Sequence, residues 1–219
     1  MFYLSEPQQE FQLQQHLSNT NQVLLTSGRA PITLDLARVF KANAWTVHVA
    51  ETHFYHLCRY SNAVDYYITV PKPIDSSLHY AENLLNYAQE KKISLIIPTC
   101  EEIFFLAKHK SLFYSSGIDL FCESLERLKI LHHKFSFIEL LKNYQIPHPE
   151  TLTVFSQKDL NVLLSKHKKI VIKPSYSRFA KDVQVVERGQ SPSIDFLEKE
   201  WIAQEYIEGE HWSSYSICH

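Results

Sequence analysis

Short apolar runs alternate with amphipathic stretches between residues 23 and 121. The runs are strand-sized, and the stretches between them repeat their apolar residues with helical spacing. The expected strands cover residues 23–26, 45–50, 66–70, 93–98 and 118–121. Strands joined by crossover helices form a parallel sheet with helices on both faces. The sequence therefore predicts a Rossmann-like α/β domain over residues 22–123, after a polar segment over residues 1–21.

The pattern changes after Cys122. The next segments read as helices, strands and one further helix, and they cover residues 125–132, 134–143, 151–154, 156–166, 169–174, 183–186, 196–199 and 201–207. The short connections between the strands favour antiparallel pairing. We therefore expect a second, α+β domain with antiparallel strands over residues 124–219.

Glycine is scarce, because the chain has only four: Gly28, Gly117, Gly189 and Gly209. A P-loop and the G-x-G-x-x-G dinucleotide fingerprint both need closely spaced glycines to bring the backbone near phosphate. Neither motif is present. This argues against a Rossmann-type dinucleotide enzyme, and any phosphate site must be built in another way.

Composition excludes further classes. Hydrophobic residues make up 45% and charged residues 21% of the chain, as in ordinary globular proteins. Its 22 basic and 24 acidic residues give a net charge of −2, without the basic excess of a nucleic-acid binder. The polar N-terminus resembles no signal peptide, the longest apolar runs are too short for a bilayer, and the four cysteines form no C-x-x-C pair. We expect a cytoplasmic protein with no nucleic-acid or membrane partner.

Two lysines mark the second half. Lys134 opens an expected helix, and Lys173 ends an apolar strand in the sequence Val-Ile-Lys-Pro-Ser. Two such point charges, each with three donors, suit a polyphosphate. The strand at 201–207 then runs into a Glu-rich turn, where a strand edge offers adenine alternating carbonyls and amides. Val171, Ile172 and Ile207 are the expected apolar floor for the ring.

In these features the chain resembles the ATP-grasp superfamily, which includes carbamoyl-phosphate synthetase, biotin carboxylase and D-alanine–D-alanine ligase. The N-terminal sheet is similar to the pre-ATP-grasp domain, and the rest resembles the first ATP-grasp lobe. The resemblance implies that Lys134 and Lys173 contact the ATP phosphates. It also implies that the Glu205 carbonyl and the Ile207 amide form the adenine hinge, with Gln204 beside them.

The resemblance extends to the ribose site. In the family a Gly-x-Glu pattern after the hinge holds the ribose hydroxyls. Here the pattern is Gly209-Glu210-His211, so that His211 takes the glutamate position, as a histidine does in biotin carboxylase. Glu210 is the second choice.

A family loop over the phosphates differs in this chain. The loop is normally rich in glycine, but residues 175–182 contain none. Arg178, together with Lys181, is the candidate that supplies side-chain charge in place of backbone amides.

The implied function is the ATP-binding portion of a carboxylate–amine or carboxylate–thiol ligase. Such a ligase phosphorylates a carboxylate with ATP, and a nucleophile then displaces phosphate from the acyl-phosphate. Family members continue with a lobe that binds Mg²⁺, so we expect Mg²⁺ only with that lobe, and a truncated, inactive chain without it. The resemblance assigns no catalytic residue and no metal ligand to this chain.

Several questions stay open at this stage. The expected partners are ATP and a small-molecule carboxylate, and a homodimer is one of the open oligomeric states. The alternative function is a non-catalytic module that binds a nucleotide or another protein, so whether the chain is an enzyme is undecided.

Other polar residues receive simpler interpretations. Glu102 completes a Thr-x-x-Glu capping box with Thr99, which makes it a helix cap rather than a catalytic acid. Glu101 stays open, because ligands bind at the carboxyl ends of parallel strands. Residues 27–29 could hold an anion at another such end, but we interpret them as a structural turn. The His-x-x-His-x-Cys sequence at 53–58 lacks a fourth ligand at zinc spacing.

Overall fold

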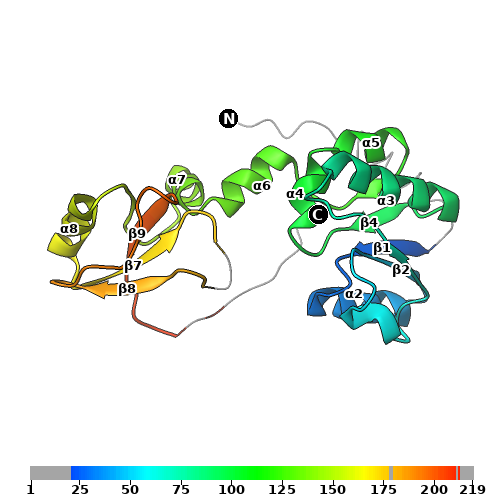
Figure 1. Ribbon diagram of the computed structural model, residues 1–219, viewed down its shortest axis with the longest axis horizontal. Helices are drawn as coiled ribbons and strands as arrows, with labels where there is room; N and C mark the ends of the chain where they lie inside the picture. Colours follow the sequence, from blue (N-terminus) through cyan, green and yellow to red (C-terminus); the bar gives the residue numbers. More distant parts are fainter. Residues whose placement is uncertain (1–20, 178–179, 211, 213–219) are drawn as a thin grey trace. The chain divides into compact units, whose positions relative to one another are not determined.

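The chain divides into two compact units, Met1–Leu125 and Glu126–His219, which we call unit 1 and unit 2 (Figure 1). The computed structural model describes residues 21–177, 180–210 and 212. The expected domains, residues 22–123 and 124–219, remain a prediction. Every helix in the described part of the chain is too short or too polar to cross a membrane.

The described residues of unit 1 form five strands, four helices and one 3-10 turn: β1 (Gln22–Thr26), α2 (Pro31–Ala42), β2 (Thr46–Glu51), η1 (Leu57–Tyr60), β3 (Tyr66–Thr69), α3 (Ser77–Lys91), β4 (Leu95–Ile97), α4 (Glu102–Ala107), α5 (Lys110–Ser115) and β5 (Asp119–Leu120). The strands form one sheet in the order β3-β2-β1-β4-β5, and every neighbouring pair is parallel. The predicted parallel sheet is confirmed. β4 is shorter than expected because the Ile93 amide donates to the Ala88 carbonyl at the end of α3, 2.8 Å away.

Helices cover both faces of this sheet, as predicted. Successive side chains of a strand point to opposite faces. In β1, Leu24 packs with Leu84 of α3 and Phe113 of α5, whereas Leu25 packs on the other side with Ala37 of α2. All five side chains are fully buried, so the central strand is covered from both directions.

The predicted capping box forms only in part. The carboxylate of Glu102 accepts hydrogen bonds from the amides of Thr99 and Cys100, each at 3.1 Å. The Thr99 hydroxyl does not cap the helix, because it donates to the Thr26 carbonyl at 2.8 Å and lies 2.6 Å from the Thr33 hydroxyl. The threonine instead joins the ends of β1 and β4.

One histidine is buried inside unit 1. His48 of β2 is 1% exposed, with its Nδ1 at 2.9 Å from the Tyr87 hydroxyl and its Nε2 at 3.0 Å from the Gln22 amide oxygen. An amide oxygen accepts, so Nε2 carries the proton and Nδ1 accepts from tyrosine. Burial lowers the pKa of His48 to about 4.

Where the structure describes unit 2, it comprises three helices and four strands: α6 (Leu125–His132), α7 (Lys134–Asn143), β6 (Thr151–Val154), α8 (Gln157–Lys166), β7 (Lys169–Pro174), β8 (Gln184–Glu187) and β9 (Trp201–Glu205). Its sheet has the order β6-β9-β7-β8, and every pair is antiparallel, which confirms the predicted strand arrangement. Leu160 and Leu163 of α8 pack against Ile170 and Ile172 of β7. This packing buries one face of the sheet.

The helix expected at residues 196–199 is wrong, since these residues form turns. The Asp195 carboxylate accepts from the Leu197 amide at 2.8 Å, a local bond that competes with helix formation. Leu197 is 96% exposed, whereas Phe196 packs against the core, so the segment does not bury a helical apolar face.

Candidate functional site

Lys134 and Lys173 come from two different elements of unit 2. Lys134 is the first residue of α7, and Lys173 lies near the end of β7, opposite Ile202 of β9. The two side chains are close enough that the charge of Lys173 lowers the pKa of Lys134. The structure therefore brings together the two lysines that the sequence singled out.

The start of α7 is attached to the end of β7. The Lys134 amide donates to the Ser175 carbonyl at 3.1 Å. The ring of His133 caps the helix, because its Nδ1 accepts from the Ser136 amide at 3.2 Å. Its other ring nitrogen lies 2.9 Å from a carboxylate oxygen of Glu200. These bonds fix the point from which the Lys134 side chain extends.

The Lys134 ammonium group meets only neutral oxygens among the described residues. It donates to the Ser177 carbonyl at 2.9 Å, to the Ser177 hydroxyl at 3.0 Å and to the Ser175 carbonyl at 3.4 Å. No carboxylate of the described residues pairs with this group. A cation held by dipoles alone remains attractive to an anion.

Lys173 is oriented by a chain of side-chain hydrogen bonds. Its ammonium group donates to the Gln204 amide oxygen at 2.9 Å. The Gln204 amide nitrogen donates to the Thr151 hydroxyl at 2.9 Å, and that hydroxyl donates to the Pro149 carbonyl at 2.9 Å. Since the amide nitrogen is already bonded to threonine, the amide oxygen must face the lysine.

The protein environment disfavours the protonated, charged form of both lysines. Burial lowers the pKa of Lys173, and the pKa of Lys134 is lowered first by burial and then by the Lys173 charge. In the described part of the chain, Lys173 also has no carboxylate partner. Two partly desolvated positive charges without a counter-charge form a site that favours an anion.

A buried hydroxyl adds a polar group here. Ser175 is 0% exposed, and its Oγ has no hydrogen-bond partner among the described residues. A buried polar atom without a partner costs free energy, which a ligand or water can recover. Its carbonyl already binds Lys134, so the free hydroxyl lies next to the lysine pair.

Residues 131–219 match the model of the ATP-grasp domain family. This part of the chain is similar to ATP-grasp domains. The matched segment includes α7 and all four strands of the antiparallel sheet, and it carries both lysines. The resemblance seen in the sequence is confirmed.

Three solved structures with similar folds support the assignment. The N5-carboxyaminoimidazole synthetase of Staphylococcus aureus, complexed with ADP, has a TM-score of 0.63 at 14% identity over 85% of this chain and 47% of its own. The L-amino acid ligase of Bacillus licheniformis has a TM-score of 0.62 at 14% identity. The match covers 87% of this chain and 45% of that protein. The third structure is the biotin carboxylase domain of the 2-oxoglutarate carboxylase of Hydrogenobacter thermophilus, a dimer with MgADP, ADP and bicarbonate. It has a TM-score of 0.60 at 14% identity, and the match covers 85% of this chain and 44% of that protein.

These likenesses concern the fold. At 14% identity they show the shared ATP-grasp architecture and do not transfer a substrate. The chain spans less than half of the length of these three proteins. No curated protein sequence matches it.

The expected adenine hinge of the ATP-grasp fold follows β9. The Glu205 amide donates to the Glu150 carbonyl at 2.9 Å, and the Tyr206 amide donates to the Lys169 carbonyl at 3.2 Å. Within the described residues, the next amide, that of Ile207, bonds to no backbone carbonyl. An unused donor at this position fits the predicted hinge, whose role in binding stays a prediction.

One part of the expected adenine floor is wrong. Ile172 is fully buried in the core against α8, because it points to the opposite face of the sheet from Lys173. Val171 lies on the same face as Lys173, since alternate residues of a strand share a face. Ile207 is 59% exposed, beyond the end of the strand.

Two predicted nucleotide residues, Arg178 and His211, lie outside the described residues. Glu210, the second choice for the ribose, is exposed and accepts from the Trp212 indole nitrogen at 3.2 Å. The structure therefore leaves all three roles as predictions.

Sequence reasoning missed three residues that the structure places beside the lysines. Ser175 and Ser177 supply oxygens to Lys134, and Thr151 orients Gln204. The two serines follow Lys173 in the printed sequence, so their proximity to one lysine was visible. Their contact with Lys134 was not, because it depends on how α7 meets the end of β7.

Proposed function

We propose that unit 2 binds ATP and that the chain is the ATP-binding portion of a carboxylate–amine or carboxylate–thiol ligase acting through an acyl-phosphate. The observation that carries the proposal is the pair Lys134 and Lys173, partly buried and without a carboxylate partner among the described residues. A polyphosphate supplies the counter-charge that the pair lacks. The ATP-grasp match and the fold neighbours crystallised with ADP support this proposal.

Each proposed contact has a chemical reason. Ammonium and guanidinium groups neutralise phosphate charge, and a strand edge reads the donor and acceptor pattern of adenine. The contacts are Lys134, Lys173 and Arg178 at the phosphates, Gln204, the Glu205 carbonyl and the Ile207 amide at the adenine, and His211 at the ribose.

The complete reaction needs more than the residues described above. Phosphoryl transfer depends on Mg²⁺ to neutralise the developing charge. Since the chain spans under half of its structural neighbours, we propose that the Mg²⁺ ligands belong to a further lobe. The chain alone then holds ATP without ligase turnover. Its proposed substrate is a small-molecule carboxylate, its proposed assembly a homodimer, and its proposed location the cytoplasm.

Titration calorimetry tests the proposal directly. We expect ATP to bind saturably to the purified chain, and ADP to compete with it. Incubation with ATP, Mg²⁺ and pooled carboxylates and amines is expected to release no more phosphate than a Lys173→Ala control. Absence of ATP binding contradicts the proposed function. Turnover above the control contradicts only the inactivity of the chain alone.

A non-catalytic module that binds a nucleotide or another protein is the second candidate. It predicts the same ATP binding. The two candidates differ when the chain is joined to, or mixed with, a second ATP-grasp lobe. Ligase activity in that mixture supports the hypothesis that the chain is a portion of an enzyme. Its absence supports the hypothesis of a non-catalytic module.

The affinity for ATP should fall as the pH rises into the alkaline range. Folding lowers the pKa values of Lys134 and Lys173 below the usual 10.5, so both lose their charge earlier than an exposed lysine. Bound phosphate favours the protonated lysines, and binding should therefore take up protons. Calorimetry in two buffers of different ionisation enthalpy measures that uptake. A pH-independent affinity for ATP, parallel to that for adenosine, would contradict the expectation.

A further inference from the structure

One edge strand of the parallel sheet in unit 1 is open to a further strand. β3 stands at one end of the order β3-β2-β1-β4-β5, so among the described strands it pairs only with β2. Exposed sheet edges are normally protected by charged side chains, by proline or by extreme shortness. The opposite edge strand, β5, has only two residues, whereas β3 has four, with the sequence Tyr-Tyr-Ile-Thr. β3 therefore lacks a charge or a proline that would keep another strand away.

The backbone of β3 has hydrogen-bonding groups on its free side. Directly after the strand, the Val70 amide donates to the Glu51 carbonyl of β2 at 3.0 Å. Alternate residues of a parallel strand bond to the same neighbour, so Ile68 also faces β2. The amide and carbonyl groups of Tyr67 and Thr69 point the other way. They are the groups that a further strand would bind.

Aromatic side chains stand beside this free edge. The rings of Phe54 and Tyr55 are in contact, with centroids 5.0 Å apart, and both residues come from the loop that follows β2. Phe54 is 53%, Tyr55 77% and Tyr67 41% exposed. Aromatic residues and arginine are enriched where proteins bind one another. The edge thus has the composition of a binding surface.

Arg59 of η1 lies over two of these rings. Its guanidinium carbon is 4.0 Å from the centre of the Phe54 ring and 3.8 Å from the centre of the Tyr67 ring. The negative faces of aromatic rings attract a cation, so the rings hold the guanidinium in place. They offer it no carboxylate. A positive charge is therefore fixed beside the free edge of β3.

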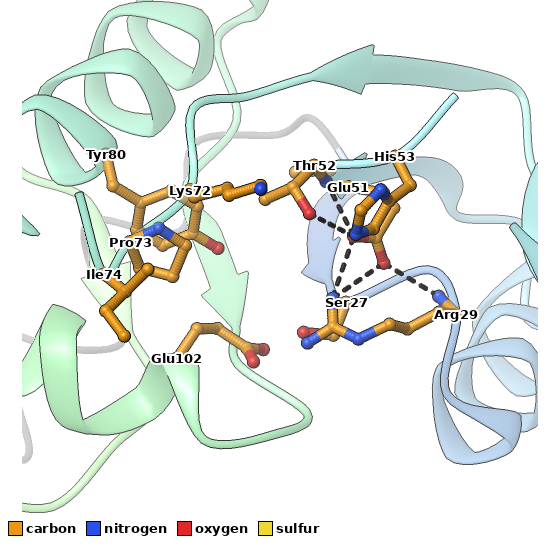
Figure 2. A pocket seen from close by; sticks show the side chains of 11 residues that line it. Ser27, Arg29, Glu51, Thr52, His53, Lys72, Pro73, Ile74, Tyr80 and Glu102 are labelled. Carbon is orange, nitrogen blue, oxygen red and sulfur yellow. Dashed lines mark hydrogen bonds and ion pairs between the residues drawn. The ribbon is translucent and has the colours of Figure 1, made fainter. Parts of the chain in front are cut away.

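The charge of Arg59 is unpaired, unlike that of Arg29. Arg29 lines a pocket at the carboxyl edge of the sheet, where its guanidinium donates to both oxygens of the Glu51 carboxylate, at 2.8 and 3.0 Å (Figure 2). Among the described residues, no carboxylate pairs with Arg59, and none of its five side-chain donors has a hydrogen-bond partner. Arg59 therefore attracts an acidic group.

This charge decides between two possible occupants of the edge. A second copy that added its own β3 antiparallel, about a two-fold axis perpendicular to the sheet, would present the same face. Neighbouring strands lie about 5 Å apart, so both Arg59 side chains would meet on that face without a carboxylate between them. Like charges placed opposite each other are destabilising. A strand of another protein with acidic side chains on this face meets attraction instead.

We propose that the free edge of β3 binds an extended, acidic segment of a partner protein as an added strand. The backbone of the segment pairs with the outward amide and carbonyl groups of Tyr67 and Thr69, as in other cases of β-strand addition. A glutamate or aspartate on the Arg59 face accepts from the guanidinium. Alternate apolar side chains point to the other face, where Tyr66 is 55% exposed. The proposal does not depend on ATP binding.

Synthetic peptides test the proposal on the whole chain. The probe is a capped hexapeptide in which valine and glutamate alternate, so that every glutamate lies on one face of an added strand. Matched peptides replace the glutamates by glutamine or lysine, and one replaces a central valine by proline, which lacks a backbone donor. Calorimetry should show saturable binding of the glutamate peptide, about tenfold tighter than that of the glutamine peptide. The proline peptide should lose most of this affinity, and the lysine peptide should not bind.

Variants locate the surface. Arg59→Gln should weaken the glutamate peptide by about tenfold and leave the glutamine peptide unchanged. Thr69→Pro removes an outward amide, at a position where an edge strand tolerates proline, and should weaken both peptides. Lys108→Gln removes an exposed charge at the end of α4, and as the matched control it should change neither. Thermal melting shows whether each variant is folded.

Each result supports or overturns the proposal. It is overturned if the glutamate peptide does not bind saturably at millimolar concentration, or if Arg59→Gln keeps the preference for glutamate over glutamine. Acetate that displaces the peptide at equal concentration would show a simple anion site. A dimer that Thr69→Pro dissociates in sedimentation would assign the edge to a second copy, and either of these results also overturns the proposal. If Thr69→Pro does not fold, Arg59→Gln and the proline peptide still decide.

Discussion

Replacing Lys173 by alanine is expected to weaken ATP binding by about tenfold to a hundredfold. A hydrogen bond to a charged group contributes about 1.5–3 kcal/mol, and each 1.4 kcal/mol is about a factor of ten in affinity. Lys173 is poised for this role, since its ammonium group is bonded only to the neutral Gln204 amide among the described residues. Calorimetric titration of both proteins with ATP measures the difference.

Two controls separate binding from folding. Lys173→Met keeps the buried methylene stem and removes only the charge, so that it should lose ATP affinity as the alanine variant does. Lys158→Ala removes an exposed lysine of α8 in the same unit and should have no effect. Adenosine, which has no phosphates, should bind all four proteins alike. Equal losses for ATP and adenosine would mean that Lys173 supports the fold instead.

Lowering the pH from about 7 to about 4 should cost unit 1 about 3 kcal/mol of stability through His48 alone. The pKa of this histidine is about 4 in the folded protein, against an ordinary value of 6.5. Between these values the unfolded chain binds a proton that the folded chain does not. Stability therefore falls as the pH falls through that window, and it is fully retained above it.

A His48→Gln variant isolates this effect. Glutamine keeps a donor and an acceptor for the partners Gln22 and Tyr87 but does not titrate. Urea unfolding, followed by the NMR signals of β1 and β2 amides at the two pH values, gives the free energy of unfolding of each protein. The unchanged protein should lose about 3 kcal/mol more than the variant. An equal acid loss in both would show that His48 is not the source. Carboxylates also titrate in this range. Glu51 is an example: burial raises its pKa, but hydrogen bonds lower it further, to below the usual value. Such groups change the stability of both proteins equally.

Local patterns were sufficient to predict most of the fold. The apolar runs led to the central strands of unit 1, because buried parallel strands are apolar on both faces. Strand ends were less predictable. Ile93 reads as part of β4 in the sequence, yet its amide closes the end of α3. At residues 196–199 the chain buries only Phe196 and leaves Leu197 exposed, which no local pattern reveals.

The parts of the candidate site that depend on position along the sequence were predictable. The parts that depend on which face of a strand a residue occupies were not. Lys134 and Lys173 were found from their positions before a helix and at the end of a strand. Ile172 was placed with Val171 in the adenine floor, although neighbouring residues of a strand point to opposite faces of the sheet. The pocket of unit 1 lined by Arg29, Lys72 and Glu102 was not predicted, because its lining residues come from segments far apart in the sequence. Glu102 looked like a complete helix cap, and only the structure shows its second oxygen without a partner.

The strand order of unit 2 has a consequence for synthesis on the ribosome. β9 lies between β6 and β7, although among the described strands it is the last to be made. Thr151 and Gln204 pair across a separation of 53 residues, a long loop to close. Before β9 emerges, β6 has no partner in its sheet, and β7 and β8 form a hairpin that is marginal alone. Unit 1 has all its strands by Leu120 and is able to fold first. The nascent unit 2 meanwhile exposes Ile170 and Ile172, apolar surface of the kind that aggregates unless it is covered.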